Sequence, residues 1–431
     1  MATLLKTPAA WPRILLARAD AKDPTDLDAA VAAGAFDGLR RSIRDLGGAA
    51  TIATITASGL RGRGGAGFPT GEKWRTAAST EADRRYVVAN GYGADPASHT
   101  DRTLMELDPY AVIEGAAIAA FAIGAGEVFL AVRAEDSEVI ARLSTAVGFA
   151  EEAGFLGADV LGSGRDVWMS VRPVQGAYML GEETVLLKAL EGKRGQPEQR
   201  PPHPASVGLF DRPTVVNNVQ TLAAVPWILR EGADAFRAIG STDAPGTVLV
   251  QVRTPGKDGV AEVPLGTKLG DIVKLGGRMA PERSLQAMLV GGPSGGLLPA
   301  DALDTPYDFA SLRSAGAHLG SGSLVAVDDR TDLLELVGVL TRFCSNEACG
   351  KSIPCRIGTK RLAEIVSRRE GGLLRPVDTQ LAADLAHDIV ESALCDHERL
   401  ATLPLTSGMR YFGSSFDPEQ RPAPVASEAR A

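Results

Sequence analysis

Short apolar runs alternate with longer amphipathic segments through the first half of the chain. Apolar runs at 86–89, 128–132 and 167–171 predict strands. Segments with helical spacing at about 108–124 and 136–152 separate them, and two more amphipathic helices are expected over 27–60. Strands that alternate with helices are typical of a layered α/β domain.

The pattern changes after a proline-rich connector at 196–213 and a predicted helix at about 218–231. Short strands at 248–252, 260–263 and 324–327, a helix near 268–274 and a glycine-rich turn at 291–296 predict a small α+β module. From about 331 to 411 the pattern is helical, with Gly and Pro breaks near 350–358 and 371–376. Residues 414–431 are rich in Pro, Ser and charge, which favours disorder. We therefore expect a multidomain α/β, α+β and all-α chain with domains at 1–240, 241–330 and 331–412 and a disordered tail at 413–431.

Composition excludes several classes of protein. Of 431 residues, 45% are hydrophobic and 23% charged, which is ordinary for a globular protein. The net charge of −8 argues against a nucleic-acid partner, because such proteins carry a basic footprint. The most apolar stretch, 115–126, is too short for a membrane span of about 20 residues, and the apolar piece at 14–16 is too short for a signal peptide. We expect a cytoplasmic protein that does not insert into a membrane.

Glycine is concentrated in one early segment. Five glycines fall within the nine residues from Gly59 to Gly67, and Lys73 follows. Glycine lets backbone N–H groups approach a ligand closely, so this loop suits a phosphate or the edge of a flavin. A tight structural turn is the alternative, and the spacing does not match a phosphate-binding loop that ends in Lys-Ser/Thr.

All four cysteines lie in the last fifth of the chain, at Cys344, Cys349, Cys355 and Cys395. A small secreted disulfide scaffold is excluded by the length of the chain and the low cysteine density. Clustered thiols indicate instead a metal or iron–sulfur site, or a local redox device.

Five segments, at 58–74, 176–197, 213–222, 289–296 and 347–359, resemble in order those of the flavin- and NADH-binding subunit of respiratory complex I. That family includes the diaphorase subunits of NAD-reducing hydrogenases and NAD-dependent formate dehydrogenases. The resemblance covers residues 30–412. It implies a Rossmann-like flavin domain, a ubiquitin-like module of the SLBB type, and a C-terminal helical bundle whose loop carries a [4Fe–4S] cluster. Hydride would pass from NADH to FMN, and single electrons would leave through the cluster.

The resemblance also implies a set of cofactor-binding residues. Taken alone, Asn217 and Asn218 would be interpreted as a helix N-cap, and Glu182 and Glu183 as a solvated helix face. Within the family pattern they join a predicted flavin site that comprises Gly62, Arg63, Gly64, Gly65, Ala66, Gly67, Phe68, Lys73, Asn90, Gly181, Glu182, Glu183, Asn217 and Asn218.

The expected nicotinamide site departs from the family pattern. Tyr92 replaces an acid, Gly93 replaces the glutamate beside nicotinamide and ribose, and Thr76 and His203 replace two flanking phenylalanines, while Phe68 remains. Aromatic stacking is worth about 1–3 kcal/mol per base in nucleic-acid sites. Either Tyr92 or His203 supplies a substitute stack and NADH still binds, or the chain uses NADH poorly and discriminates less between NADH and NADPH. We favour the second alternative.

The expected cluster site departs as well. The family pattern Cys-Gly-x-Cys-x-Pro-Cys-Arg with a distant cysteine corresponds here to Cys349, Ser352, Cys355 and Cys395. A serine oxygen is a hard ligand and suits iron–sulfur chemistry poorly. Cys344 is an alternative ligand, although we favour a buried packing role for it. The possible outcomes are a [4Fe–4S] cluster with Ser352 or Cys344 as ligand, a three-iron cluster, or no cluster.

The leading hypothesis is an electron-transfer protein that oxidises NAD(H) or NADP(H) through FMN and an iron–sulfur centre. Its partner would be an iron–sulfur subunit of thioredoxin-like or ferredoxin type in a multi-subunit oxidoreductase, in the cytoplasm or attached through that complex to the inner membrane. The alternatives are a structural subunit with a degenerate NADH site, and a flavoprotein that uses another electron partner such as ferredoxin. We interpret His397, near Cys395, as an ordinary surface histidine.

Overall fold

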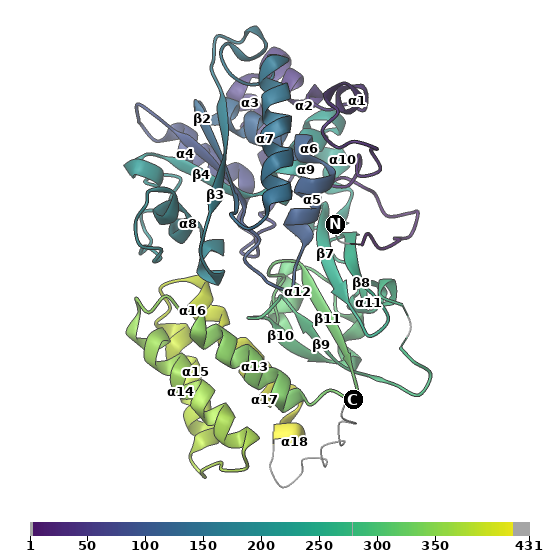
Figure 1. Ribbon diagram of the computed structural model, residues 1–431, viewed down its shortest axis with the longest axis vertical. Coiled ribbons are helices and arrows are strands. Elements are labelled where there is room, and N and C mark those ends of the chain that lie inside the picture. Colours follow the sequence, from purple (N-terminus) through teal and green to yellow (C-terminus); the bar gives the residue numbers. More distant parts are fainter. Residues whose placement is uncertain (1–2, 278, 417–431) are drawn as a thin grey trace. The chain divides into compact units, whose positions relative to one another are not determined.

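The computed structural model describes residues 3–277 and 279–416, and it divides into two compact units. The first comprises the chain up to Gln251 together with Gly259–Thr267, and the second comprises Val252–Asp258 and the chain from Lys268 onward (Figure 1). Of the predicted disordered tail, residues 413–416 form helix α18 (Gly413–Phe416), and residues 417–431 lie outside the described residues. The predicted domain boundaries at 240 and 330 stay a prediction.

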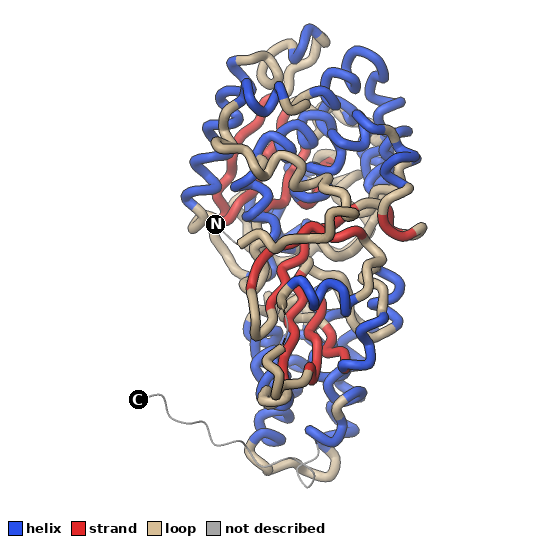
Figure 2. Tube along the Cα trace, turned by 90° about the vertical axis from the view of Figure 1, so that its right-hand side faces the viewer, coloured by secondary structure: helices blue, strands red, loops and turns tan. Residues whose placement is uncertain are grey.

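A parallel sheet forms the centre of the first unit. Its strands are β1 (Tyr86–Gly91), β2 (Glu127–Arg133), β3 (Trp168–Val174) and β4 (Thr214–Asn218), in the order β3-β2-β1-β4. All three pairings are parallel, and Figure 2 shows the strands flanked by helices. The three predicted strands are confirmed. Strand β4 was not predicted, because its run of apolar residues is short and stands between a proline-rich connector and two asparagines that resemble a helix cap.

Helix α6 (Pro109–Ile123) is buried along its whole length because it packs against β1 and against α9 (Val219–Glu231). Asp108 caps its first turn by accepting from the N–H of Ala111. Gly115 permits the close crossing of the two helices, since a Cβ there would lie 2.0 Å from the carbonyl oxygen of Leu222. The predicted helices at 108–124 and 218–231 are confirmed.

The remaining helices of the first unit surround this core. The segment at 27–60, predicted as two helices, contains three α-helices and one π-helical turn at Ser42–Leu46. The α-helices of the unit not yet named are α1 (Leu27–Ala32), α2 (Asp37–Arg41), α3 (Gly47–Ala57), α4 (Thr70–Ser79), α5 (Thr100–Leu107), α7 (Ser137–Glu152), α8 (Glu183–Leu190) and α10 (Ala233–Arg237).

Short strands follow where the α+β module was predicted. Strands β7 (Thr247–Arg253) and β8 (Asp258–Pro264) flank the expected turn, preceded by the small pair β5 (Gly240–Ser241) and β6 (Ala244–Pro245). In the second unit, β10-β9-β11 form antiparallel neighbours. The ubiquitin-like character of this region stays a prediction. The elements concerned are α11 (Leu269–Leu275), β9 (Leu285–Val290), β10 (Gly296–Pro299), α12 (Phe309–Ser314) and β11 (Ser323–Asp328).

The last part of the second unit is helical, as predicted. Its helices share an apolar core that includes Val337, Leu362, Ile389 and Leu405. The predicted breaks coincide with the loops before and after α14. No described helix is long and apolar enough to cross a membrane. The helices are α13 (Leu333–Asn346), α14 (Ile353–Glu370), α15 (Asp378–Glu391), α16 (Asp396–Leu400) and α17 (Leu403–Tyr411).

Candidate functional site

The carboxyl ends of β1 and β4 lie side by side at the point where the order of the sheet reverses. Strands β2 and β3 extend the sheet on one side of β1, and β4 adds to the other side. Asn90 of β1 is in register with Asn218 of β4, and Ala89 with Asn217. In open parallel sheets, ligands bind at the carboxyl ends of strands at such a switch point. Three of the predicted cofactor-binding residues therefore meet at the expected edge.

The glycine loop approaches the same edge. Its base is closed by two backbone hydrogen bonds of 2.9 Å, from Gly62 N–H to the Phe68 carbonyl and from Thr70 N–H to the Leu60 carbonyl. Gly65 and Gly67 adopt φ values of 104° and 66°, which favour glycine. A Cβ on Gly64 would lie 3.4 Å from the Cβ of Asn218. The loop is thus an out-and-back turn that touches the end of β4.

Arg63 points into the protein and holds this loop in place. Its side chain is 1% exposed, and its guanidinium donates to the carbonyls of Thr247 at 3.0 Å, Pro245 at 2.5 Å and Arg61 at 2.9 Å. Its backbone N–H donates to Thr221 Oγ1 at 2.8 Å. Burial lowers the pKa of Arg63 to about 9, and the nearby charge of Arg61 contributes to this lowering. The guanidinium is therefore occupied by carbonyl groups of the protein.

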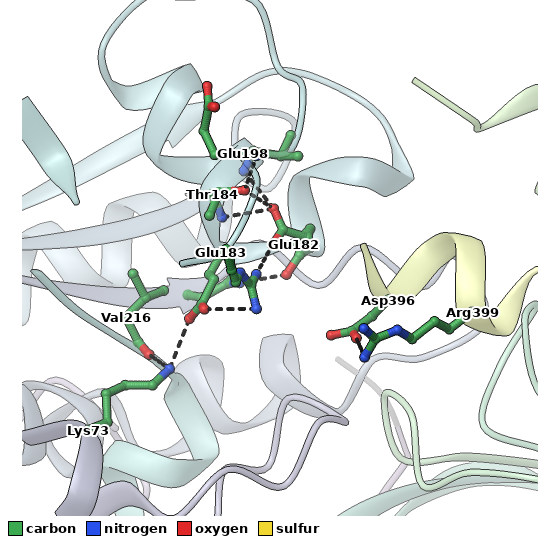
Figure 3. Close-up of polar contacts among 12 residues, drawn as sticks. Lys73, Glu182, Glu183, Thr184, Glu198, Val216, Asp396 and Arg399 are labelled. Carbon is green, nitrogen blue, oxygen red and sulfur yellow. Dashed lines mark hydrogen bonds and ion pairs between the residues drawn. The ribbon is translucent and has the colours of Figure 1, made fainter. Parts of the chain in front are cut away.

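Lys73, on α4, places a positive charge beside β4. Its Nζ donates to Glu183 Oε2 and to the carbonyl of Val216, both at 2.9 Å (Figure 3). Burial would raise the pKa of Glu183, but the charges of Lys73 and Arg200 outweigh it and hold that pKa below its ordinary value. The ion pair is mostly shielded from solvent, since each side chain is 19% exposed.

Glu182 caps the helix that follows it. Its carboxylate accepts from the N–H groups of Thr184 and Val185, both at 2.9 Å, and pairs with Arg200. The interpretation of Glu182 and Glu183 as a solvated helix face is wrong, because a helix cap and ion pairs hold both carboxylates partly buried. The cap fixes the turn at Gly181–Glu183.

Side-chain amides at the strand ends are held by fixed partners. Trp74 Nε1 donates to Asn217 Oδ1 at 2.9 Å. Asn218 caps α9 by accepting from Gln220 N–H at 2.9 Å, so its interpretation as an N-cap is confirmed. Asn90 Nδ2 donates to the carbonyl of Gly181 at 3.1 Å. These bonds tie β1, β4 and the turn before α8 together.

Asp101 is a site residue that sequence reasoning missed. Its carboxylate accepts from Asn218 Nδ2 at 2.7 Å and from Gln220 Nε2 at 2.8 Å. Burial raises the pKa of Asp101, although the two amide donors oppose this. Nothing in the pattern around α5 marks this aspartate, because its partners lie more than a hundred residues away in the chain.

The expected nicotinamide side differs from one of our alternatives. Tyr92 is 1% exposed, and the guanidinium of Arg133 lies 4.7 Å from the centre of its ring while donating to the Gly93 carbonyl at 2.8 Å. Tyr92 as a substitute stacking surface is therefore wrong, since its ring is covered. His203 is exposed and stays an alternative, and Phe68 is 49% exposed.

The predicted cluster ligands gather at one end of the helical bundle. Cys349 and Ser352 lie in the loop before α14, Cys355 in its first turn, and Cys395 directly before α16. Burial raises the pKa of the Cys355 thiol to about 12, and negative charge on Glu398, Cys395, Cys349 and Cys344 adds to this effect. Such coupling requires all four thiols to lie near one another. The cysteines form no disulfide.

Cys344 and His397 are both buried behind this loop. The Cys344 thiol is 1% exposed and donates to the carbonyl of Pro293 at 3.6 Å, which agrees with a packing role. The ring of His397 is hydrogen-bonded to the Cys344 carbonyl at 3.0 Å and is 8% exposed. The interpretation of His397 as a surface residue is wrong, because it satisfies a carbonyl near the end of α13.

The residues present fit both implied cofactors. Glycine N–H groups, amides and the Lys73 ammonium supply the donors that a flavin phosphate and ring edge require. Three thiols and a serine hydroxyl supply the donors of an iron–sulfur cluster, with one oxygen where sulfur is usual. In the described part of the chain, no group of three or more His, Cys, Asp or Glu residues is placed to hold a single metal ion. A cluster of several irons is wider than one ion and takes more widely spaced ligands.

Comparison with known proteins identifies the family. Residues 55–227 match the Nuo51 FMN-binding domain, and residues 335–419 match the NADH-ubiquinone oxidoreductase-F iron-sulfur binding region. The second F-type NADH-quinone oxidoreductase protein of Rhizobium meliloti (strain 1021) is 37% identical over 94% of this chain and 96% of its own length. This chain belongs to the family of F-type NADH-quinone oxidoreductase subunits.

Hydrogenase proteins in this family are equally similar. The NADP-reducing hydrogenase subunit HndC of Solidesulfovibrio fructosivorans is 38% identical over 92% of this chain and 81% of its own length. The crystal structure of an NAD⁺-reducing [NiFe]-hydrogenase in the H₂-reduced state matches 98% of this chain and 68% of that chain, with a TM-score of 0.85 and 30% identity. The predicted family resemblance is therefore confirmed, and the family's FMN-binding segment contains the glycine loop and both strand ends described above.

Proposed function

We propose that this chain is the electron-input component of a multi-subunit oxidoreductase, which transfers electrons from NAD(P)H through FMN to an iron–sulfur centre. The observation that carries the proposal is the convergence of the glycine loop, Lys73 and the asparagines at the switch point of the parallel sheet. The support comes from the family that the chain belongs to and from the donor chemistry of the site.

The first part of the site would hold FMN. Bound FMN would supply two-electron acceptance of hydride and one-electron release. The loop at Gly62–Gly67 would offer backbone N–H groups to the phosphate, and Lys73 would neutralise negative charge. Asn90, Asn217 and Asn218 would offer amide groups to the polar edge of the ring, with Glu182 and Glu183 fixing the turn opposite.

The nucleotide site would keep one of its aromatic surfaces. Phe68 is exposed beside the loop, and the ammonium of Lys73 lies 5.9 Å from the centre of its ring. Because no side chain replaces the carboxylate expected at Gly93, a cofactor with an additional phosphate would meet less negative charge there. Weaker use of NADH and weaker discrimination against NADPH stay part of the proposal.

The second part of the site would hold the iron–sulfur centre at Cys349, Cys355 and Cys395, with Ser352 at the fourth position. Cys344 stays an alternative ligand, and it would have to give up its bond to the Pro293 carbonyl to reach the cluster. We infer a partner subunit of thioredoxin-like or ferredoxin type that carries its own iron–sulfur cluster. We place the complex in the cytoplasm or at the inner membrane surface.

The deciding experiment is an absorption spectrum of the anaerobically purified full chain, before and after NADH or NADPH. A flavin spectrum that bleaches with either nucleotide supports the proposal. A chain that contains flavin and bleaches rapidly with NADH, but not with NADPH, contradicts the altered nucleotide preference. A colourless chain that takes up no FMN on reconstitution contradicts the proposed function and supports a structural role.

A further inference from the structure

The first two turns of α14 present an apolar surface to solvent. Ile353 is 64% exposed and Ile357 is 50% exposed, and residues four apart lie on the same face of a helix. Isoleucine is a poorer helix former than Ala, Lys or Glu, so helix propensity does not account for it there. Single exposed apolar residues are ordinary, and the surroundings of this pair make it informative.

Basic side chains surround the two isoleucines. Arg356 and Lys360 are exposed, and neither forms an ion pair with any residue that the structure describes. Lys351 is exposed in the preceding loop, and the N-terminus of the helix adds partial positive charge. These five residues, Lys351, Ile353, Arg356, Ile357 and Lys360, are called the α14 face below. It is a patch of positive charge on a chain whose net charge is −8.

The positive charge is specific to this helix. Helix α14 contains more arginine and lysine residues than glutamates, whereas α15, which packs against it, contains several acidic residues and no arginine or lysine. The exposed acidic residues Asp384, Asp388 and Glu391 all belong to α15. A partner attracted by negative charge on its own surface would therefore be directed to α14 rather than to the bundle as a whole.

The α14 face also covers the predicted cluster site. Cys355 lies between the two isoleucines in the sequence, and its side chain is 4% exposed. Cys349 and Ser352 lie in the loop that contains Lys351. A protein seated on this face would approach the thiols through a single layer of side chains, which suits electron exchange.

We propose that the α14 face is the docking surface for an acidic iron–sulfur protein that exchanges single electrons with this chain; this inference rests on the proposed function. Complementary charge steers encounter and fixes orientation. Transient redox interfaces are small, below about 1,200 Å², which suits an apolar centre of two isoleucines within a basic rim. Each encounter moves one electron from the reduced chain to the oxidised iron of the partner, and NAD(P)H supplies the two electrons for two encounters.

The test uses the full chain carrying its cofactors and an acidic plant-type [2Fe–2S] ferredoxin as the probe. Binding is measured by calorimetry at low and high salt. The double variant Ile357→Ser/Lys360→Glu is expected to bind about tenfold more weakly and to show a smaller salt dependence. Leu381→Ser on α15 and Arg375→Glu in the loop after α14 are matched controls, and both are expected to bind as the unmodified chain does.

Reduction of ferricyanide by NADH or NADPH, measured on every variant, separates the two proposals. If the unmodified chain reduces no ferricyanide with either nucleotide, the proposed function fails. If it reduces ferricyanide but does not bind ferredoxin, or if the double variant binds ferredoxin as well as the controls do, the docking inference is overturned. Cytochrome c, a basic electron acceptor, is expected not to bind, and equal binding of both probes would overturn the charge argument.

Discussion

Glu114 is expected to make the first unit less stable as the pH rises. This glutamate lies on α6 with 0% exposure. Its Oε1 accepts from the N–H of Leu39 at 3.1 Å, and no described residue forms a hydrogen bond with its Oε2. Burial raises the pKa of Glu114 from 4.5 to about 7, although the N–H of Phe36, the charge of Arg18 and the N–H of Leu39 oppose this. The carboxyl is therefore held in its neutral form at slightly acidic pH.

The size of the effect follows from this difference in proton affinity. Each tenfold change is worth about 1.4 kcal/mol, so the ionised group reduces the free energy of unfolding by about 3 kcal/mol relative to the neutral group. Below pH 4.5 the carboxyl is protonated in both the folded and the unfolded chain, and there is no penalty. Between pH 4.5 and about 7 only the unfolded chain ionises, so stability falls as the pH rises, and above about 7 the full penalty applies.

The substitution Glu114→Gln removes this titration and keeps an oxygen that accepts from the N–H groups of Phe36 and Leu39. Relative to the unmodified chain, the variant is expected to gain about 3 kcal/mol between acidic and mildly alkaline pH. Urea unfolding followed by tryptophan fluorescence measures this gain, because all four tryptophans, at positions 11, 74, 168 and 227, belong to the first unit.

A matched control tests a carboxyl in a different environment. Glu138 on α7 is 46% exposed and pairs with Arg142 at 2.9 Å, and such pairs contribute about 0–1 kcal/mol. Glu138→Gln is expected to change stability by less than about 1 kcal/mol at every pH. If the difference between Glu114→Gln and the unmodified chain is the same at acidic and alkaline pH, the buried carboxyl is not held neutral and the reasoning is refuted.

Three further predictions concern helix packing and the two cofactor sites. Gly115→Ala is expected to destabilise the first unit by several kcal/mol, because its Cβ would overlap the carbonyl of Leu222, whereas Gly148→Ala in α7, where a Cβ meets nothing within 4 Å, should be neutral or stabilising by up to about 1 kcal/mol; equal melting temperatures would contradict this. Lys73→Met should lower the FMN content per chain while Lys73→Arg retains most of it, and unchanged flavin content in Lys73→Met would show that the ammonium does not hold the cofactor. Ser352→Cys should raise the iron and sulfide content of anaerobically purified chain and give the EPR signal of a reduced four-iron cluster, and identical spectra before and after the change would contradict a role for position 352.

Much of the site was predictable from sequence because its chemistry is local. The glycine loop, the Asn217-Asn218 pair and the spacing of Cys349, Ser352 and Cys355 are each recognisable within a few residues. The strands around the loop were also predictable, since buried parallel strands form continuous apolar runs. Strand β4 was not, because so short a run becomes a strand only when β1 is beside it to satisfy its backbone hydrogen bonds.

Side-chain direction was the least predictable property. Arg63 was expected to face the flavin, but its guanidinium is held by carbonyls of residues 245 and 247. Tyr92 was expected to offer a stacking surface, but Arg133 covers its ring. His397 was expected at the surface, but it is hydrogen-bonded to a carbonyl of α13. In each case the deciding partner is distant in sequence, so no local pattern records it.

The sequence by itself determined the order of the elements, the family, the chemistry of the loop and the missing thiol at position 352, because each depends on residue type and spacing along the chain. Only the tertiary structure decided that Asn90 and Asn218 meet at the reversal point of the sheet and that Asp101 joins them. Only the fold, likewise, placed an uncompensated basic and apolar surface over Cys355. The physical reason is that convergence, burial and charge balance are properties of neighbours in space, and these neighbours are separated by tens to more than a hundred residues of chain.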